Sequence, residues 1–157
     1  MADSPISPER ISKLTEMITG WLENQLSSKT LVQSVEHNEQ ERRWYVRIAG
    51  EEKDNSMVLL TLGQRTLHYE TYFMPSPEEN RQEVFHYLLR KNAKLYGISF
   101  GVGSEDAVYL SGQISSEAID DDTLDWVIGT IYSAVEECFN PSLQLGFASR
   151  FRSRASD

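Results

Sequence analysis

The chain has 157 residues, 39% of them hydrophobic and 25% charged, with a formal net charge of −9. This balance is typical of a folded globular domain and excludes a disordered chain, because there is enough apolar surface to build a core. No run reaches the ~20 apolar residues of a membrane span, and the opening MADSPISPER lacks the apolar stretch of a secretory signal. A single cysteine, Cys138, excludes an internal disulfide and favours a reducing, cytoplasmic location.

The negative charge is concentrated before the last eight residues. Without Arg150, Arg152, Arg154 and Asp157, 12 basic and 23 acidic residues remain, a net charge of −11. No Lys or Arg occurs between Lys94 and Arg150. Because phosphate backbones and anionic lipids attract cations, we expect neither a nucleic-acid partner nor a membrane partner. The acidic surface is interpreted as solubilising or as a face for a basic partner.

The first predicted element is a helix with a well-defined start. Ser7 is placed to cap it, Pro8 suits its first position, and Ile6 can pack on Ile11. Apolar residues then recur every three or four positions, at Ile11, Leu14, Ile18, Trp21, Leu22 and Leu26. We expect this helix to end at residues 27–28.

Three or four antiparallel strands are predicted next. Alternation of Trp44, Val46 and Ile48 with polar neighbours indicates a half-buried strand. The other candidate segments are 31–37, the nearly continuous apolar run 57–62, expected to be covered on both faces, and 65–74, where Leu67, Tyr69, Thr71 and Phe73 share a face.

A second helix is expected from Ser76 to about Asn92. Ser76 as cap, Pro77 at the first position and Glu79 completing a capping box would define its start. Its apolar residues are Val84, Phe85, Leu88 and Leu89. Period-two spacing then predicts that the helix passes directly into a strand, with Tyr96, Ile98, Phe100 and Val102 alternating along it.

The last predicted elements are a strand over 107–114 and a helix capped by Asp122. The helix carries its apolar stripe at Leu124, Val127, Ile128, Ile131, Val135 and Cys138, and Asn140–Pro141 is expected to stop it. The order α-β-β-β(-β)-α-β-β-α predicts an α+β fold with a mostly antiparallel sheet covered by helices. Residues 1–149 are interpreted as one domain and 150–157 as a basic, frayed tail.

No group of residues in the sequence has both the spacing and the partner residues of a metal or cofactor site. His37, His68 and His86 lie on different elements, and Glu83 with His86 forms only one of the paired motifs that a di-metal bundle needs. The DDxxD spacing of residues 121–125 could hold magnesium, but aspartates at a helix start are explained by capping and by the helix dipole. We therefore expect no metal and no cofactor.

Catalytic motifs are also lacking. Gly97, Gly101 and Gly103 lie in a strand that leads into another strand, so they favour twist or close packing over phosphate binding. Cys138 lies on an apolar helix stripe, where a thiol behaves as a small hydrophobic group. No constellation for nucleophilic catalysis is present, and the sequence does not predict an enzyme.

Several aromatic side chains are expected on faces opposite to the core. Tyr45, Tyr72, Tyr87 and Tyr109 are the tyrosines in this position. An element that is apolar on two faces is covered on both, by its own domain or by a partner. The candidate interaction or dimer surface therefore comprises Tyr72, Tyr87, Lys91, Tyr109 and Phe147.

Two segments resemble the YbjN family of bacterial proteins named as sensory-transduction regulators. They are residues 85–97, FHYLLRKNAKLYG, and residues 139–149, FNPSLQLGFAS. The resemblance implies a fold similar to that of type III secretion chaperones, which usually act as homodimers, bind extended segments of partner proteins and have no catalytic residues. The strand between residues 57 and 74 departs slightly from the chaperone order.

The resulting functional hypothesis is a non-enzymatic protein–protein interaction module, chaperone-like or regulatory, that forms a homodimer and binds a segment of an unknown partner protein. An apolar groove or an exposed sheet edge would accept that segment. The alternative is a small-molecule-sensing regulator, which would need a pocket with convergent polar groups.

Overall fold

The computed structural model describes residues 5–156, with side chains to residue 152. One antiparallel sheet of six strands, in the order β1-β2-β3-β4-β6-β5, organises the chain. The helices are α1 (Pro8–Ser27), α2 (Arg81–Asn92), α3 (Asp121–Gly146) and α4 (Ala148–Ser156). The strands are β1 (Val32–Asn38), β2 (Arg43–Ala49), β3 (Asn55–Leu62), β4 (Thr66–Met74), β5 (Ser99–Val102) and β6 (Val108–Ser115).

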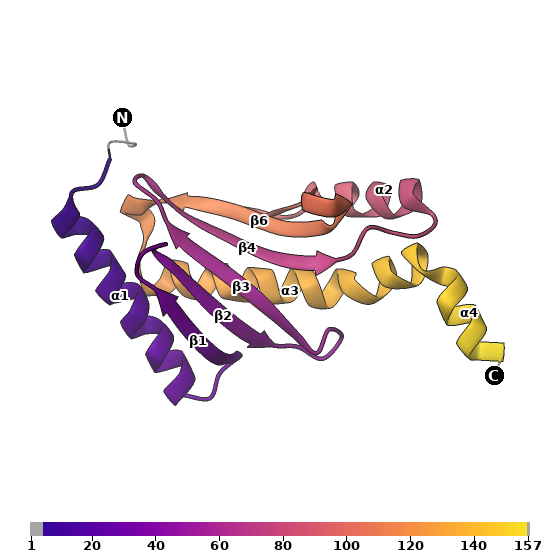
Figure 1. Cartoon of the computed structure of the whole chain (residues 1–157), viewed down its shortest axis with the longest axis horizontal. Coiled ribbons are helices and arrows are strands. Elements are labelled where there is room, and N and C mark those ends of the chain that lie inside the picture. The colour runs from indigo at the N-terminus through magenta and orange to yellow at the C-terminus, as the bar shows by residue number, and fades with distance from the viewer. Residues whose placement is uncertain (1–4, 157) are drawn as a thin grey trace.

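The main helices lie on one side of the sheet. Figure 1 shows α3 running along the sheet, with α1 crossing one end of the molecule and α2 at the other. α1 contacts β1, α2 contacts β5, and α3 contacts both of these helices as well as β4. The α+β class and the antiparallel sheet predicted from the sequence are confirmed.

Alternation along the strands places the core between the sheet and the helices. Trp44, Val46 and Ile48 on β2 are buried, and all four residues predicted to share a face of β4 are also buried. The segment 65–74 is a strand of the main sheet, paired with β3 on one side and β6 on the other. β3 differs from the prediction: its burial alternates, so that only one of its faces is fully covered.

The start of α1 confirms the sequence prediction. Ser7 caps the helix, and its hydroxyl accepts a hydrogen bond from the Arg10 N–H at 3.2 Å. Pro8 occupies the first position, where no N–H is needed. The helix ends at Ser27, as expected.

The start of α2 was predicted wrongly at Ser76. The helix begins at Arg81 after Asn80, which has a φ of 53°. The residues of the expected capping box dock instead onto the end of α3, since the N–H groups of Glu78 and Glu79 donate to the Gly146 carbonyl at 2.9 and 3.1 Å. Tertiary contacts thus override a local capping signal.

The passage from α2 to β5 is a bend, whereas the sequence suggested a direct junction. Gly97 has a φ of +78°, and a side chain there would collide with the Trp126 ring. The Gly97 carbonyl accepts a hydrogen bond from the Tyr69 hydroxyl at 2.7 Å. This turn delays the strand to Ser99 and leaves Tyr96 outside it, 82% exposed.

Both ends of α3 also differ from expectation. Asp120, rather than Asp122, caps the helix and accepts a hydrogen bond from the Thr123 N–H at 2.7 Å. Pro141 lies inside the helix, which continues to Gly146. Proline removes one N–H, but packing of the following turn compensates, with Ser142 and Gly146 buried and Gly146 lying against Pro77.

The start of the C-terminal tail is helical in the structure. α4 extends through Ser156, and Arg150 pairs with Glu78, with Nε and Oε1 2.8 Å apart. Arg152 lies 3.8 Å from a Glu79 oxygen. The side chain of Arg154 and residue 157 lie outside the described part of the chain.

Candidate protein-interaction surface

An apolar hollow of about 250 Å³, the α2–β5 groove, lies between α2 and the edge of the sheet. It is lined by Phe85, Leu88, Leu89, Phe100, Gly101, Val102 and Val108. Leu89 is 65% exposed and Val102 is 55% exposed, although both are large apolar side chains. Exposed apolar side chains beside a groove mark a surface that another molecule can cover.

The free edge of β5 is closed at its centre by Asn92. The Asn92 amide donates to the Phe100 carbonyl at 3.1 Å, and its Oδ1 accepts the Phe100 N–H at 2.7 Å. Asn92 therefore takes the hydrogen-bonding place of a neighbouring strand. Because these backbone groups are already paired, the backbone of Phe100 is not free to pair with an added strand.

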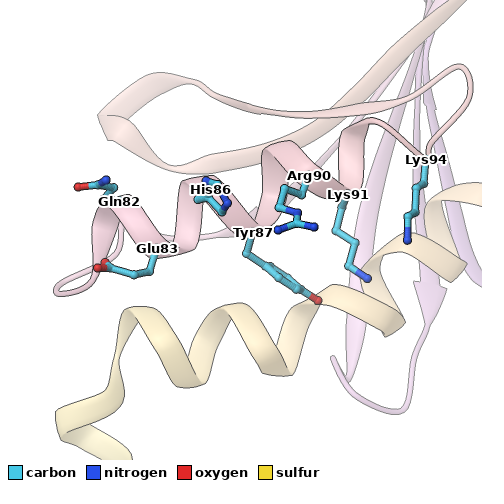
Figure 2. Close-up of a pocket in the computed structure, with 7 residues that line it drawn as sticks. All are labelled: Gln82, Glu83, His86, Tyr87, Arg90, Lys91 and Lys94. Carbon is cyan, nitrogen blue, oxygen red and sulfur yellow. The ribbon is translucent and has the colours of Figure 1, made fainter.

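The other side of α2 carries a basic hollow of about 490 Å³. It is lined by Gln82, Glu83, His86, Tyr87, Arg90, Lys91 and Lys94. Figure 2 shows Tyr87 and Lys91 extending from α2 toward α3, with Arg90 and Lys94 directed to the same side. This arrangement follows from helical spacing, because residues three and four apart share a face.

Tyr87 and Lys91 join α2 to α3 within one chain. Lys91 Nζ lies 2.9 Å from Glu137 Oε1 and 5.4 Å from the centre of the Tyr87 ring. Burial, with smaller contributions from the neighbouring Cys138 and Glu137, raises the pKa of Tyr87 to about 12. Burial also raises the pKa of the Cys138 thiol, which disfavours the nucleophilic thiolate at neutral pH.

The open face of the sheet carries an aromatic pair. Tyr72 on β4 and Tyr109 on β6 are register partners, and their rings meet edge to face with centroids 5.6 Å apart. Lys53 supports this pair from the β2–β3 loop by donating to the carbonyls of Tyr72 and Phe73 at 2.8 and 3.1 Å. Burial lowers the pKa of Lys53.

Phe147 lies at the junction of α3 and α4 and is only 8% exposed. It borders a hollow of about 240 Å³ with Pro75, Leu143, Arg150 and Phe151. The Arg150 guanidinium carbon is 5.7 Å from the centre of its ring. Phe147 thus packs on its own chain.

The structure places the five predicted surface residues in three separate regions. Tyr87 and Lys91 lie at the α2–α3 contact, Tyr72 and Tyr109 on the open sheet face, and Phe147 at the α3–α4 junction. Their role in an interface stays a prediction.

Sequence reasoning missed four residues of α2, β5 and the turn between them. The sequence places Leu89 and Val102 in regular apolar patterns. In the structure, Leu89 lies outside the buried face of α2, and Val102 lies at the end of an edge strand. The signal for Arg90 and Lys94 was their place as the last cations before a long acidic interval.

The described residues also bear on metal binding and on membrane insertion. They contain no group of three or more His, Cys, Asp or Glu side chains placed to hold a metal ion. None of their helices is long and apolar enough to cross a membrane.

Residues 16–143 match the YbjN family, described as "Putative bacterial sensory transduction regulator". The chain is 36% identical over 104 residues to "Uncharacterized protein Rv0487" of Mycobacterium tuberculosis, covering 66% of this chain and 57% of the relative. It is 34% identical over 107 residues to "Uncharacterized protein ML2442" of Mycobacterium leprae, covering 68% and 58%. The chain thus spans less than two thirds of the length of these relatives.

Solved structures share the fold at low sequence identity. The ExsC–ExsE complex matches with a TM-score of 0.57 and 17% identity, covering 78% of this chain and 91% of the other. The HopA1–SchA chaperone–effector complex matches with a TM-score of 0.56 and 12% identity, covering 87% and 99%. A third match is the Yersinia pestis type III secretion chaperone SycH with a fragment of YscM2, with a TM-score of 0.50 and 17% identity, covering 76% and 97%. The chain therefore belongs to the YbjN family and has the fold of type III secretion chaperones.

Proposed function

We propose that this chain is a non-enzymatic protein–protein interaction module that forms a homodimer and binds a segment of a partner protein, in a chaperone-like or regulatory role. The observation that carries the proposal is the α2–β5 groove with its exposed Leu89 and Val102. Its lining is almost entirely apolar. We place the protein in the cytoplasm, where its single thiol, Cys138, stays reduced.

A second copy suits this surface because the surface carries both a hollow and a protruding apolar side chain. In a two-fold dimer the same patch meets itself, so Leu89 of each copy can enter the groove of the other. The contact needs only side chains, which agrees with the closure of the β5 edge by Asn92. The structural neighbours ExsC, SchA and SycH were solved with bound proteins, which supports a protein as the ligand of this fold.

Light scattering at micromolar concentration tests the dimer. We expect twice the chain mass for the wild type and the chain mass for Leu89→Glu, because a carboxylate would be buried at the contact. Ser12→Glu adds the same charge at an exposed position of α1 and serves as the matched control, which should remain a dimer. A monomeric wild type would contradict the homodimer.

Affinity capture with the wild-type chain tests the partner segment, because a specific partner should be retained and then identified. The sensor hypothesis gives the opposite result, namely no captured protein together with thermal stabilisation by a metabolite. The basic hollow on α2 is where such a metabolite would be sought.

A further inference from the structure

The basic side of α2 carries cations that the fold itself does not neutralise. Within residues 5–152, no carboxylate oxygen lies within 4.0 Å of Arg90 or Lys94, whereas Lys91 is paired with Glu137. Arg90 and Lys94 are exposed, while Lys91 and Tyr87 are half-buried. The hollow therefore has a fixed wall made by Tyr87 and Lys91 and two free cations on its rim.

The cations on this side of α2 lie close together in the sequence. Residues 90–94 hold three of the 12 cations that precede residue 150, in a body with a net charge of −11. On such a surface a basic patch selects ligands of opposite charge and repels most others.

We propose that the basic hollow of α2 binds an extended, acidic segment of a partner protein, with Arg90 and Lys94 contacting two of its carboxylates. The inference rests on the proposed function only in taking a protein segment as the ligand. The site lies on the side of α2 opposite the α2–β5 groove, so both surfaces can be occupied together.

The spacing of the cations sets the pattern of the segment. Arg90 lies in the last turn of α2 and Lys94 in the turn that follows this helix. Both side chains line the same hollow, so they can contact two carboxylates on one side of a bound segment. In an extended segment, side chains two positions apart lie about 6.6 Å apart on one face, whereas adjacent side chains point to opposite faces. The hollow therefore matches two acidic residues separated by one residue.

Glu83 places a negative charge at one end of the basic hollow. Glu83 lies seven residues before Arg90 on α2, which corresponds to about 10 Å along the helix axis. It therefore lines the end of the hollow opposite to Lys94. An acidic side chain is repelled there. The acidic pair is therefore seated at the Lys94 end, with polar or basic residues of the segment near Glu83.

Other anionic ligands fit the hollow less well. A nucleic acid would meet a body with a net charge of −11, which opposes a phosphate backbone beyond the few cations of this site. A small metabolite needs a pocket that encloses most of its surface, whereas five of the seven lining residues are exposed. An extended segment needs only one open side.

Fluorescence anisotropy with labelled short peptides tests the proposal on the full chain. The probe carries two glutamates separated by one serine in a serine background, and two comparison peptides have the glutamates adjacent or replaced by glutamine. We expect the separated glutamates to bind more tightly than either comparison peptide. Arg90→Gln/Lys94→Gln should weaken this binding about five- to tenfold, as expected for the loss of two exposed ion pairs.

Arg10→Gln/Lys13→Gln is the matched control, because it removes the same charge from exposed positions of α1. Equal loss of binding in both double variants, equal binding of the three peptides, or no binding of any peptide would overturn the proposal. Dissociation of the dimer in Arg90→Gln/Lys94→Gln would also overturn it, because the acidic occupant would then belong to a second copy.

The dimer measurement separates this inference from the proposed function. A wild-type dimer that does not prefer the separated glutamates contradicts the acidic-segment site alone. A wild-type monomer that binds the separated glutamates contradicts the homodimer and supports the acidic-segment site.

Discussion

Asn92 is the residue whose removal most directly tests how the edge of the sheet is protected. In Asn92→Ala the two hydrogen bonds to the Phe100 backbone, at 2.7 and 3.1 Å, are lost. Each neutral bond of this kind contributes about 1 kcal/mol, and alanine returns about 0.6 kcal/mol through its higher helix propensity. We expect a net loss of about 1.5 kcal/mol in the free energy of unfolding, measured by urea denaturation, or about 3–6 °C in Tm.

Two further variants sharpen this test. Asn92→Asp keeps the acceptor for the Phe100 N–H but turns a carboxylate oxygen toward the Phe100 carbonyl, so it should be destabilised at neutral pH and recover as the carboxyl is protonated below about pH 4. Gln82→Ala is the control for helix propensity, because it also introduces alanine into α2 but at an exposed position. If Asn92→Ala loses less than about 0.5 kcal/mol relative to Gln82→Ala, the edge is not held by this side chain.

Two other predictions concern contacts between α3 and the rest of the fold. The Glu136 carboxylate accepts backbone N–H groups of the β2–β3 turn at 2.8 and 3.1 Å, so Glu136→Ala should lower the urea-derived stability by about 1 kcal/mol. Glu136→Gln, which keeps one acceptor oxygen, should lower it less, and equal stabilities for all three chains would contradict this role. Tyr87 has a pKa raised to about 12, against about 10 in the unfolded chain, so the folded state keeps a proton that the unfolded state loses between these pH values. Wild-type stability should therefore fall by up to about 2 kcal/mol more than that of Tyr87→Phe between about pH 10 and pH 12, and parallel pH curves would refute it.

The sequence predicted elements well where local and tertiary signals agree. Ser7, Pro8 and the apolar stripe of the first helix indicate the same boundary, and α1 has that boundary. On β4, alternation identified the buried face, since a strand that separates a core from an open face must alternate.

Prediction failed where distant contacts compete with a local signal. Ser76, Pro77 and Glu79 are a good helix start, but the end of α3 binds this segment through Gly146 and the start of α4 binds it through Ser149. Pro141 is a good helix stop, but buried turns on both sides carry the helix past it. Neither outcome is visible from spacing alone.

Only part of the candidate surface could be predicted from the sequence. The sequence places Tyr87 and Lys91 on the correct helix, but it does not predict the ion pair with Glu137 that holds Lys91. Leu89 fits the same periodicity as the buried Leu88, and only the position of β5 beside α2 shows which of the two is covered.

The two sides of α2 should respond differently to salt, which allows their roles to be separated in one protein. The dimer contact proposed around Leu89 would be apolar, so screening of charges should leave it largely unchanged or strengthen it. The contact proposed at Arg90 and Lys94 would be electrostatic and exposed, and the Debye length falls from about 8 Å at 0.15 M to about 3 Å at 1 M salt. We expect high salt to release the acidic peptide while light scattering still reports a dimer. If the peptide and the dimer dissociate together over the same salt range, one surface of α2 serves both contacts, and the division between its apolar and basic sides is wrong.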